Sequence, residues 1–226
     1  MSGNDVTVVL AHGAWADGSS WARVIERLAD QGLRALAAPL PLTGFEDDVA
    51  ALERTIARTE GPVVLAAHAY AGAVIGAERS DRVKALAFIA ALAPDEGETV
   101  ADVFYRAEPH PLAPKLAPDP DGLIWLPDEA FAAAFAPQAS AREQAVLAAV
   151  QRPISPACIT VPMAAPRWRD LPSWYLVAEE DRMIPAETQR FMAERMGARV
   201  VSRPADHTPL VTDPDAVAAL IVDAAK

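Results

Sequence analysis

The chain has 226 residues, of which 52% are apolar and 23% charged, a composition typical of one folded domain and not of a disordered segment. Its formal net charge of −11 repels phosphate backbones, so nucleic acid is not an expected partner. The single cysteine, Cys158, cannot form an intramolecular disulfide, which favours a cytoplasmic location. No apolar run reaches the ~20 residues that span a bilayer, and residues 1–5 are too short and polar to be a signal peptide.

Short apolar runs alternate with amphipathic segments in the first part of the chain. This pattern predicts a mostly parallel sheet with helices on both faces, an α/β fold. Ser20 is expected to cap the first helix and Gly32 to end it. The predicted elements are strands at residues 6–10, 33–37, 63–67 and 83–92, and helices at 20–31, 46–59 and from about 71.

The pattern changes between residues 97 and 169, where prolines are frequent and no strand is expected. Large apolar side chains are too numerous there to stay solvated, so the segment is predicted to be an inserted cap and not a linker. Two helices are expected inside it, at residues 128–136 and 141–149. The alternation then resumes with strand 173–178, helix 186–196, strand 199–203 and helix 214–225. Residues 1–226 are thus predicted to form one domain carrying a cap at about 97–169.

Three loops that follow predicted strands carry the candidate chemistry, because ligands of open α/β sheets bind beyond the carboxyl ends of the strands. In the first loop, the turn at His12 and Gly13 can aim a backbone N–H group at a developing oxyanion; such a dipeptide is also an ordinary tight turn. The second loop stands where a nucleophile elbow, G-x-S-x-G, is expected. There Ala67, Ala69 and Ala71 replace both glycines and the serine, so in isolation it predicts only a strand–loop–helix junction.

The third feature is a pair of residues, Asp181 and His207, each of which follows a predicted strand. Elbow, acid and histidine come in the chain order typical of α/β hydrolases. An aspartate bonded to one imidazole nitrogen fixes the tautomer and leaves the other nitrogen as a base. A lone histidine in a loop is usually structural, but the matched order and placement favour a catalytic pair.

The chain resembles the small α/β hydrolases that include plant methylesterases and hydroxynitrile lyases, and more closely their bacterial esterase relatives. The resemblance implies the α/β-hydrolase fold, with Asp181 and His207 as acid and base. It also implies that the backbone N–H groups of Ala14 and Tyr70 form the oxyanion hole. The stretches that carry it are HGAWADGSSW, AHAYAGAVI, FIAALAPDEGET, EEDRMIPAETQRFMAERMGA and ADHTPLVTDPDAV.

The chain departs from this family at Ala69, which stands at the position of the serine nucleophile. A methyl group cannot attack a carbonyl carbon, so the acyl-enzyme route of the family is closed. A directed Ser→Ala replacement would explain this one position, whereas natural loss in an alanine-rich chain explains Ala67 and Ala71 as well. We therefore favour natural loss.

Other candidate residues concern the pocket and not the chemistry. Trp15, Tyr105 and Trp125 are candidates to line an apolar substrate pocket, and each is equally suited to a core. Thr208 follows the histidine at a position where branches of the family differ. Cys158 lies in the cap, where a lone cysteine usually packs. The four histidines lack metal-ligand spacing and the glycines form no phosphate-binding loop, so neither a metal nor another cofactor is expected.

Three functions stay open on this basis. The first is an enzyme that acts on a small, largely apolar ester or carbonyl compound, with the pair His207–Asp181 as general base in a hydrolase or a lyase. The second is a carboxylesterase with its serine replaced by Ala69. The third is a non-catalytic protein that binds small molecules. In each case the expected partner is a small molecule and not a membrane, and a homodimer is left open.

Overall fold

One parallel sheet forms the centre of the molecule. The computed structural model describes residues 6–226, so the polar segment expected at residues 1–5 lies outside the described part. The sheet has six strands in the order β2-β1-β3-β4-β5-β6, and all paired neighbours run parallel. The strands are β1 (Thr7–Ala11), β2 (Arg34–Ala38), β3 (Val63–His68), β4 (Val83–Ile89), β5 (Ser173–Ala178) and β6 (Arg199–Arg203).

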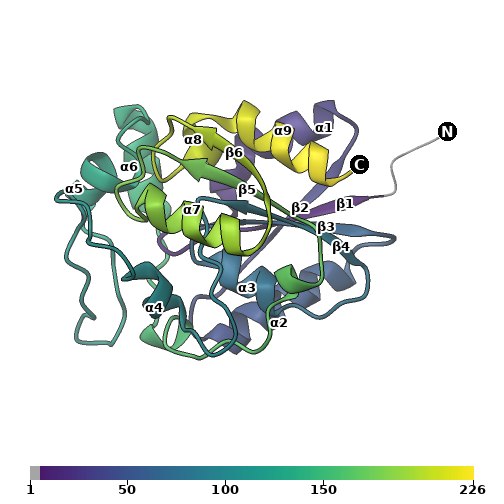
Figure 1. The fold of residues 1–226 in the computed structure, drawn as a ribbon. Coiled ribbons are helices and arrows are strands. Elements are labelled where there is room, and N and C mark those ends of the chain that lie inside the picture. The colour runs from purple at the N-terminus through teal and green to yellow at the C-terminus, as the bar shows by residue number, and fades with distance from the viewer. Residues whose placement is uncertain (1–5) are drawn as a thin grey trace.

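Helices cover both faces of this sheet, with α1 and α9 on one side and α2 and α3 on the other (Figure 1). The predicted α/β architecture is thereby confirmed. The α-helices are α1 (Ala22–Asp30), α2 (Phe45–Ala57), α3 (Ala71–Ala77), α4 (Val100–Phe104), α5 (Asp128–Ala130), α6 (Ala141–Val150), α7 (Ala186–Arg195), α8 (Pro209–Thr212) and α9 (Pro214–Ala224). The shorter turns are η1 (Gly18–Trp21), η2 (Phe131–Phe135), η3 (Pro156–Cys158) and η4 (Arg167–Arg169).

The period-two alternation of side chains along the strands divides the core into two layers. Val8 and Leu10 of β1 pack with α1 and α9, whereas Val9 and Ala11 of the same strand pack in the layer that holds α2 and α3. Because successive side chains of a strand point to opposite faces, the uninterrupted apolar run of β1 fills both layers. This explains why every residue of β1 is buried.

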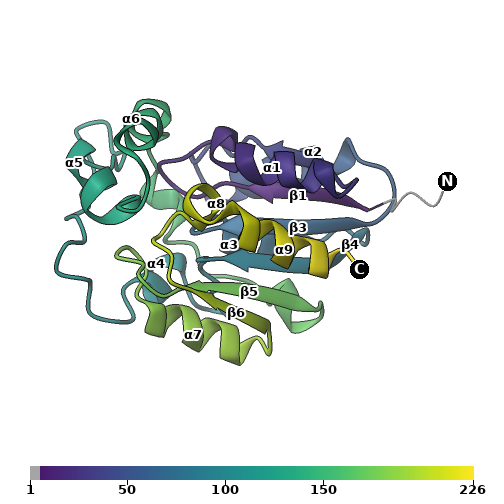
Figure 2. The ribbon, with the colours of Figure 1, turned by 90° about the horizontal axis from the view of Figure 1, so that it is seen from above.

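The strand order reverses beside β1, which lies between β2 and β3. Ala11, the last residue of β1, pairs with Ala67 near the end of β3. The loops that follow these two strands therefore leave the sheet side by side, at the kind of switch point where open α/β sheets bind ligands. The segment between β4 and β5, which includes α5 and α6, lies beyond the same edge of the sheet (Figure 2).

Two predicted boundaries were wrong for local reasons. The first helix begins as the 3-10 turn η1, whose cap is Asp17 and not Ser20, because the Asp17 carboxylate accepts the N–H of Ser19. Strand β4 ends at Ile89 and not at residue 92, because Ala90 adopts a φ of 45°, which no strand accommodates.

The segment between residues 97 and 169 differs in detail from the prediction. The helix expected at residues 128–136 divides into α5 and a π-type turn, η2. The short helix α4, which was not predicted, begins with a capping box between Thr99 and Asp102. In the described part of the chain, the extended pairing in this segment consists of two isolated bridges that share Ile124. None of the helices described is long and apolar enough to cross a bilayer.

Candidate active site

The structure brings Asp181 and His207 together at the carboxyl edge of the sheet. Asp181 lies in the loop after β5 and His207 in the loop after β6, and the distance from the Asp181 Oδ2 atom to the His207 Nδ1 atom is 2.8 Å. Both side chains are buried. A hydrogen bond of this kind holds the proton on Nδ1, which leaves the Nε2 atom of His207 as the basic nitrogen.

Three further donors fix the Asp181 carboxylate. Its Oδ1 atom accepts the backbone N–H groups of Met183 and Ile184, at 2.7 and 2.9 Å. Its Oδ2 atom accepts the side-chain amide of Gln189 at 2.8 Å. The Gln189 amide is itself anchored, because its Oε1 atom accepts the N–H of Ala178 at the end of β5. The carboxylate is therefore held in one orientation, aimed at the imidazole.

The elbow after β3 keeps the backbone of a nucleophile turn although its central residue is alanine. Ala69 has a φ of 49°, a left-handed conformation that costs an alanine about 1–2 kcal/mol. The turn is held from outside, because the carbonyl of Ala69 accepts the N–H groups of Leu92 at 2.9 Å and Gly72 at 3.1 Å. A side chain at Gly72 would place its Cβ atom 2.3 Å from the Leu92 carbonyl oxygen, so the close approach of helix α3 requires this glycine.

The loop after β1 packs directly against this elbow. A Cβ atom at Gly13 would lie 2.9 Å from the Cβ atom of Ala69, which only glycine avoids. Gly13 thereby brings the next residue, Ala14, to the wall of the same pocket as Tyr70. Within residues 6–226, neither the Ala14 nor the Tyr70 backbone N–H donates to another protein group. Free N–H groups beside a pocket are the donors that an oxyanion hole requires.

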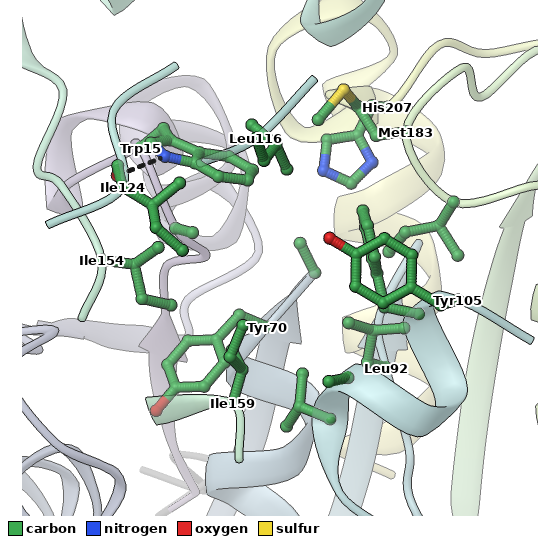
Figure 3. Close-up of a pocket in the computed structure, with 16 residues that line it drawn as sticks. Trp15, Tyr70, Leu92, Tyr105, Leu116, Ile124, Ile154, Ile159, Met183 and His207 are labelled. Atoms are coloured by element: carbon green, nitrogen blue, oxygen red, sulfur yellow. Dashed lines mark hydrogen bonds between the residues drawn. The ribbon is translucent and has the colours of Figure 1, made fainter. Parts of the chain in front are cut away.

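These residues surround one apolar pocket, with the imidazole of His207 at its wall (Figure 3). None of the described residues that line it is Asp, Glu, Lys or Arg. A neutral, apolar ligand therefore suits the pocket better than a charged one, which would lose its hydration without gaining an ion pair. The lining consists of Ala14, Trp15, Ala69, Tyr70, Leu92, Val100, Ala101, Phe104, Tyr105, Leu116, Ile124, Ile154, Ile159, Met183, Ile184 and His207.

The four residues predicted to contact substrate divide into two pairs. Trp15 and Tyr105 line the pocket, and the indole N–H of Trp15 donates to the carbonyl of Ile124 (Figure 3). Trp125 lies outside the lining, because its side chain is 45% exposed and its indole N–H donates to Asp119. Thr208 does not line the pocket; it is buried, and its N–H and hydroxyl groups donate to Asp206.

A buried polar cluster supports the far side of the elbow. The Tyr70 hydroxyl points away from the pocket and donates to the Asp48 carboxylate at 2.7 Å, and the N–H of Leu42 donates to the same carboxylate. Burial raises the pKa of Asp48 and raises the pKa of Tyr70 well above its ordinary value. The Cys158 thiol lies 3.6 Å from Asp48, and burial raises its pKa to about 12. A thiol with such a pKa is not a ready nucleophile, in agreement with a packing role.

His68, inside the elbow, is a structural neighbour of the base. Its Nε2–H donates to the backbone carbonyl of His207 at 2.7 Å. Burial lowers the pKa of His68 well below its ordinary value, and His207 adds in the same direction. His68 is therefore neutral and helps to hold the loop that carries His207. In the described residues, no group of three or more potential ligands is arranged to hold a metal ion.

Sequence reasoning missed the residues that support the pair, chiefly Gln189 and Asp206. The Asp206 carboxylate is fully buried and accepts the N–H and hydroxyl of Thr208. Asp206 stands in the stretch that carried the family resemblance, but only its neighbour His207 has a recognisable chemical role. The signal of Gln189 is weaker, because a glutamine on a helix is ordinarily exposed.

Comparison with known proteins agrees with this architecture. The family model described as the alpha/beta hydrolase family matches residues 8–220, whereas no curated protein sequence matches the chain. Among solved structures, polyneuridine aldehyde esterase is similar with a TM-score of 0.79 at 19% identity, over 97% of this chain and 99% of its own. The pyrethroid hydrolase from Sphingobium faniae JZ-2 is similar with a TM-score of 0.82 at 24% identity, over 97% of each chain.

A plant protein extends the same likeness. The methylesterase protein MES16 from Arabidopsis is similar with a TM-score of 0.78 at 15% identity, over 97% of this chain and 98% of its own. At these identities the likeness to solved structures shows the fold. Together with the family model, it confirms the expected α/β-hydrolase fold and family.

Proposed function

The chain belongs to the alpha/beta hydrolase family, and we propose that it is an esterase-like hydrolase that works by general-base catalysis without a covalent intermediate. The observation that carries this proposal is the hydrogen bond between Asp181 and His207, 2.8 Å long, at the wall of a pocket that also contains Ala69. A buried carboxylate beside an imidazole is a costly arrangement that only good geometry repays. Here it supports a base that faces the pocket.

The proposed reaction is direct attack of water on a small, neutral, apolar ester. The Nε2 atom of His207 removes a proton from water, and the hydroxide oxygen bonds to the carbonyl carbon. The backbone N–H groups of Ala14 and Tyr70 stabilise the resulting oxyanion. When the intermediate collapses, the bond to the alkoxide breaks and the imidazolium returns its proton to that oxygen, giving an acid and an alcohol. Asp181 stays ionised throughout and orients the imidazole.

The experiment compares hydrolysis of a panel of short-chain aryl esters by the unaltered chain and by its His207→Ala variant. A positioned base accelerates such reactions by about 10²–10⁴-fold, so the variant should lose most of the turnover above the uncatalysed rate. His110→Ala is the matched control, because His110 lies in the cap and its ring accepts only a local N–H from Leu112. The proposal also requires that no burst of alcohol precedes the steady state, since Ala69 cannot be acylated.

One observation favours a second candidate, a protein that binds a small molecule and does not transform it. Alanine at position 69 removes the nucleophile while the pocket remains apolar. Equal slow turnover by the unaltered chain and by His207→Ala, together with saturable binding of a neutral ester, would favour this candidate over the hydrolase.

A further inference from the structure

One short cap segment is bonded to residues on both sides of Asp181 and beside His207. The segment is residues 131–138, here called the clasp. Arg182, which follows Asp181, donates to the carbonyl of Ala133 at 2.7 Å. The side-chain amide of Gln138 donates to Glu180, which precedes Asp181, at 2.9 Å. The loop that carries Asp181 is thus bonded to the clasp on both sides of this residue.

The clasp is also bonded to the loop that carries His207. The Asp206 carboxylate is fully buried. Its Oδ1 atom accepts from groups close in sequence, Thr208 and Thr212. Its Oδ2 atom accepts the backbone N–H of Gln138 at 2.9 Å. Loss of this single bond would leave a buried carboxylate oxygen without a donor, which is expensive, so the clasp and the loop are held in a fixed relation.

The clasp also packs against the imidazole itself. Phe135 is 1% exposed, and its ring meets the His207 ring edge to face, with a centroid distance of 5.2 Å. The same phenyl ring lies 6.4 Å from the His68 ring and 6.4 Å from the Trp15 ring. The π-type turn η2 ends at Phe135, and such turns often occur at functional sites because they redirect a side chain. Phe135 therefore limits rotation of the imidazole away from Asp181.

We propose that the clasp is a fixed positioning element of the Asp181–His207 pair and not a moving lid, with Gln138 and Asp206 as positioning residues. Neither residue lines the pocket, so each acts on the reaction only through the loops that it holds. The catalytic consequence rests on the proposed function, whereas the effect on the imidazole does not. Because a fixed clasp does not open, substrate enters past another part of the cap, at Tyr105, which is 57% exposed and also lines the pocket.

The test measures the imidazole tautomer of His207 by ¹⁵N NMR in chains labelled at histidine, because the two ring nitrogens report where the proton resides. Gln138→Ala removes the side-chain bonds to Glu180 and to the Pro204 carbonyl. Asp206→Asn replaces one of the two acceptor oxygens by an NH2 group, so either the Gln138 N–H or the donors of Thr208 and Thr212 lose their acceptor. Gln151→Ala is the control, because its amide also makes two bonds, each 3.2 Å long, but both join the backbone of Leu126, outside the clasp.

We expect the unaltered chain and Gln151→Ala to show one tautomer, with the proton on Nδ1. In Gln138→Ala and Asp206→Asn, the two ring ¹⁵N shifts of His207 should move toward each other as the tautomers average. If both variants keep the parent shifts, the positioning proposal is overturned. If Asp206→Asn does not fold, Gln138→Ala decides, since its side chain is exposed and its removal leaves no buried group unsatisfied.

The catalytic consequence has a separate readout. In the Ala69→Ser background, each clasp variant should lower kcat for an aryl ester about 10-fold, the effect of one charge-assisted hydrogen bond, and change KM less than about twofold. Altered tautomer shifts with no esterase activity in the Ala69→Ser parent would overturn the proposed function and leave the positioning role intact. Unaltered His207 shifts in the clasp variants, together with esterase activity in the Ala69→Ser parent, would overturn the positioning role and leave the proposed function intact.

Discussion

Restoring a serine at position 69 tests whether the site is complete except for its nucleophile. The Ala69→Ser change adds one hydroxyl group to a turn that already has the left-handed φ of 49°, so the backbone need not rearrange. The acceptor of the new hydroxyl proton would be His207, which Asp181 already orients at 2.8 Å. The proposed donors to the oxyanion are the backbone N–H groups of Ala14 and Tyr70, which bind no protein acceptor within residues 6–226.

The size of the gain follows from general kinetics. Removing the nucleophile of a serine hydrolase lowers kcat by about 10⁶-fold, about as much as removing the whole triad. The unaltered chain should lie above that low level by the contribution of its base, about 10²–10⁴-fold. The ratio of the two factors predicts that Ala69→Ser raises kcat for short-chain aryl esters by about 10²–10⁴-fold over the unaltered chain. The variant should also show a burst of alcohol equal to the enzyme concentration, since an acyl-serine can now accumulate.

The assay is stopped-flow release of the aryl alcohol by the unaltered chain, Ala69→Ser, and Ala69→Ser combined with His207→Ala. The gain must disappear in the double variant, because the serine has no activating base there. A folded Ala69→Ser variant without gain and without burst would refute the reasoning, since it would mean that His207 cannot reach the hydroxyl or that the two N–H groups do not face the carbonyl oxygen. The proposed hydrolase would then lose its main geometric support.

Three further outcomes concern stability and are measured by chemical denaturation. Ala69→Gly should leave the free energy of unfolding within about 0.5 kcal/mol of the parent value or raise it, because relief of the left-handed strain offsets the added entropy of the unfolded chain. The same change at Ala145, which is exposed within α6, should lower the free energy of unfolding by about 1 kcal/mol. Equal losses at both sites would contradict the strain at position 69. Gly72→Ala should lower the free energy of unfolding by about 1–3 kcal/mol, since its Cβ atom would overlap the Leu92 carbonyl oxygen. Burial raises the pKa of Asp48 in the folded state, so the unfolded chain loses this proton first as pH rises above about 4. The parent chain therefore loses stability from about that pH up to the folded pKa. The free energy of unfolding of Asp48→Asn should increase relative to that of the parent over this range, and a difference independent of pH would contradict this.

Most of the strands were predictable because they combine an apolar run with breakers at their ends, whereas β6 has only Val200 and Val201 as apolar residues and is exposed throughout. Strands β5 and β6 have the bounds expected from the sequence, residues 173–178 and 199–203. The prediction for β4 ran too far because the apolar run continues through Leu92, and no residue type there signals that Ala90 turns into the left-handed region. Hydrophobicity places a strand, but it does not place the turn that ends it.

The pair Asp181 and His207 was predictable because chemistry and chain order coincide there. Asp181 and His207 have a recognisable order and lie together, whereas Trp125 was chosen for its residue type alone and is at the surface. Gln138 had no signal in the sequence, because its side chain bonds Glu180 and Pro204, which lie more than 40 residues further along the chain. Contacts of this kind depend on how the segment between β4 and β5 folds back on the sheet, which periodicity and motif spacing do not encode.

The strained elbow cannot by itself decide between a catalyst and a binding protein. The carbonyl of Ala69 accepts two N–H groups and Gly72 packs on the Leu92 carbonyl, so the surrounding scaffold imposes the left-handed turn whatever the side chain. The stronger argument comes from the pair that the scaffold does not impose. A binding pocket for a neutral ligand gains nothing from a buried carboxylate that requires three donors besides an imidazole, and replacing such a group with well-packed apolar side chains is often neutral or stabilising. The presence of Asp181, with both carboxylate oxygens accepting hydrogen bonds, therefore favours a role in which His207 gains and releases a proton.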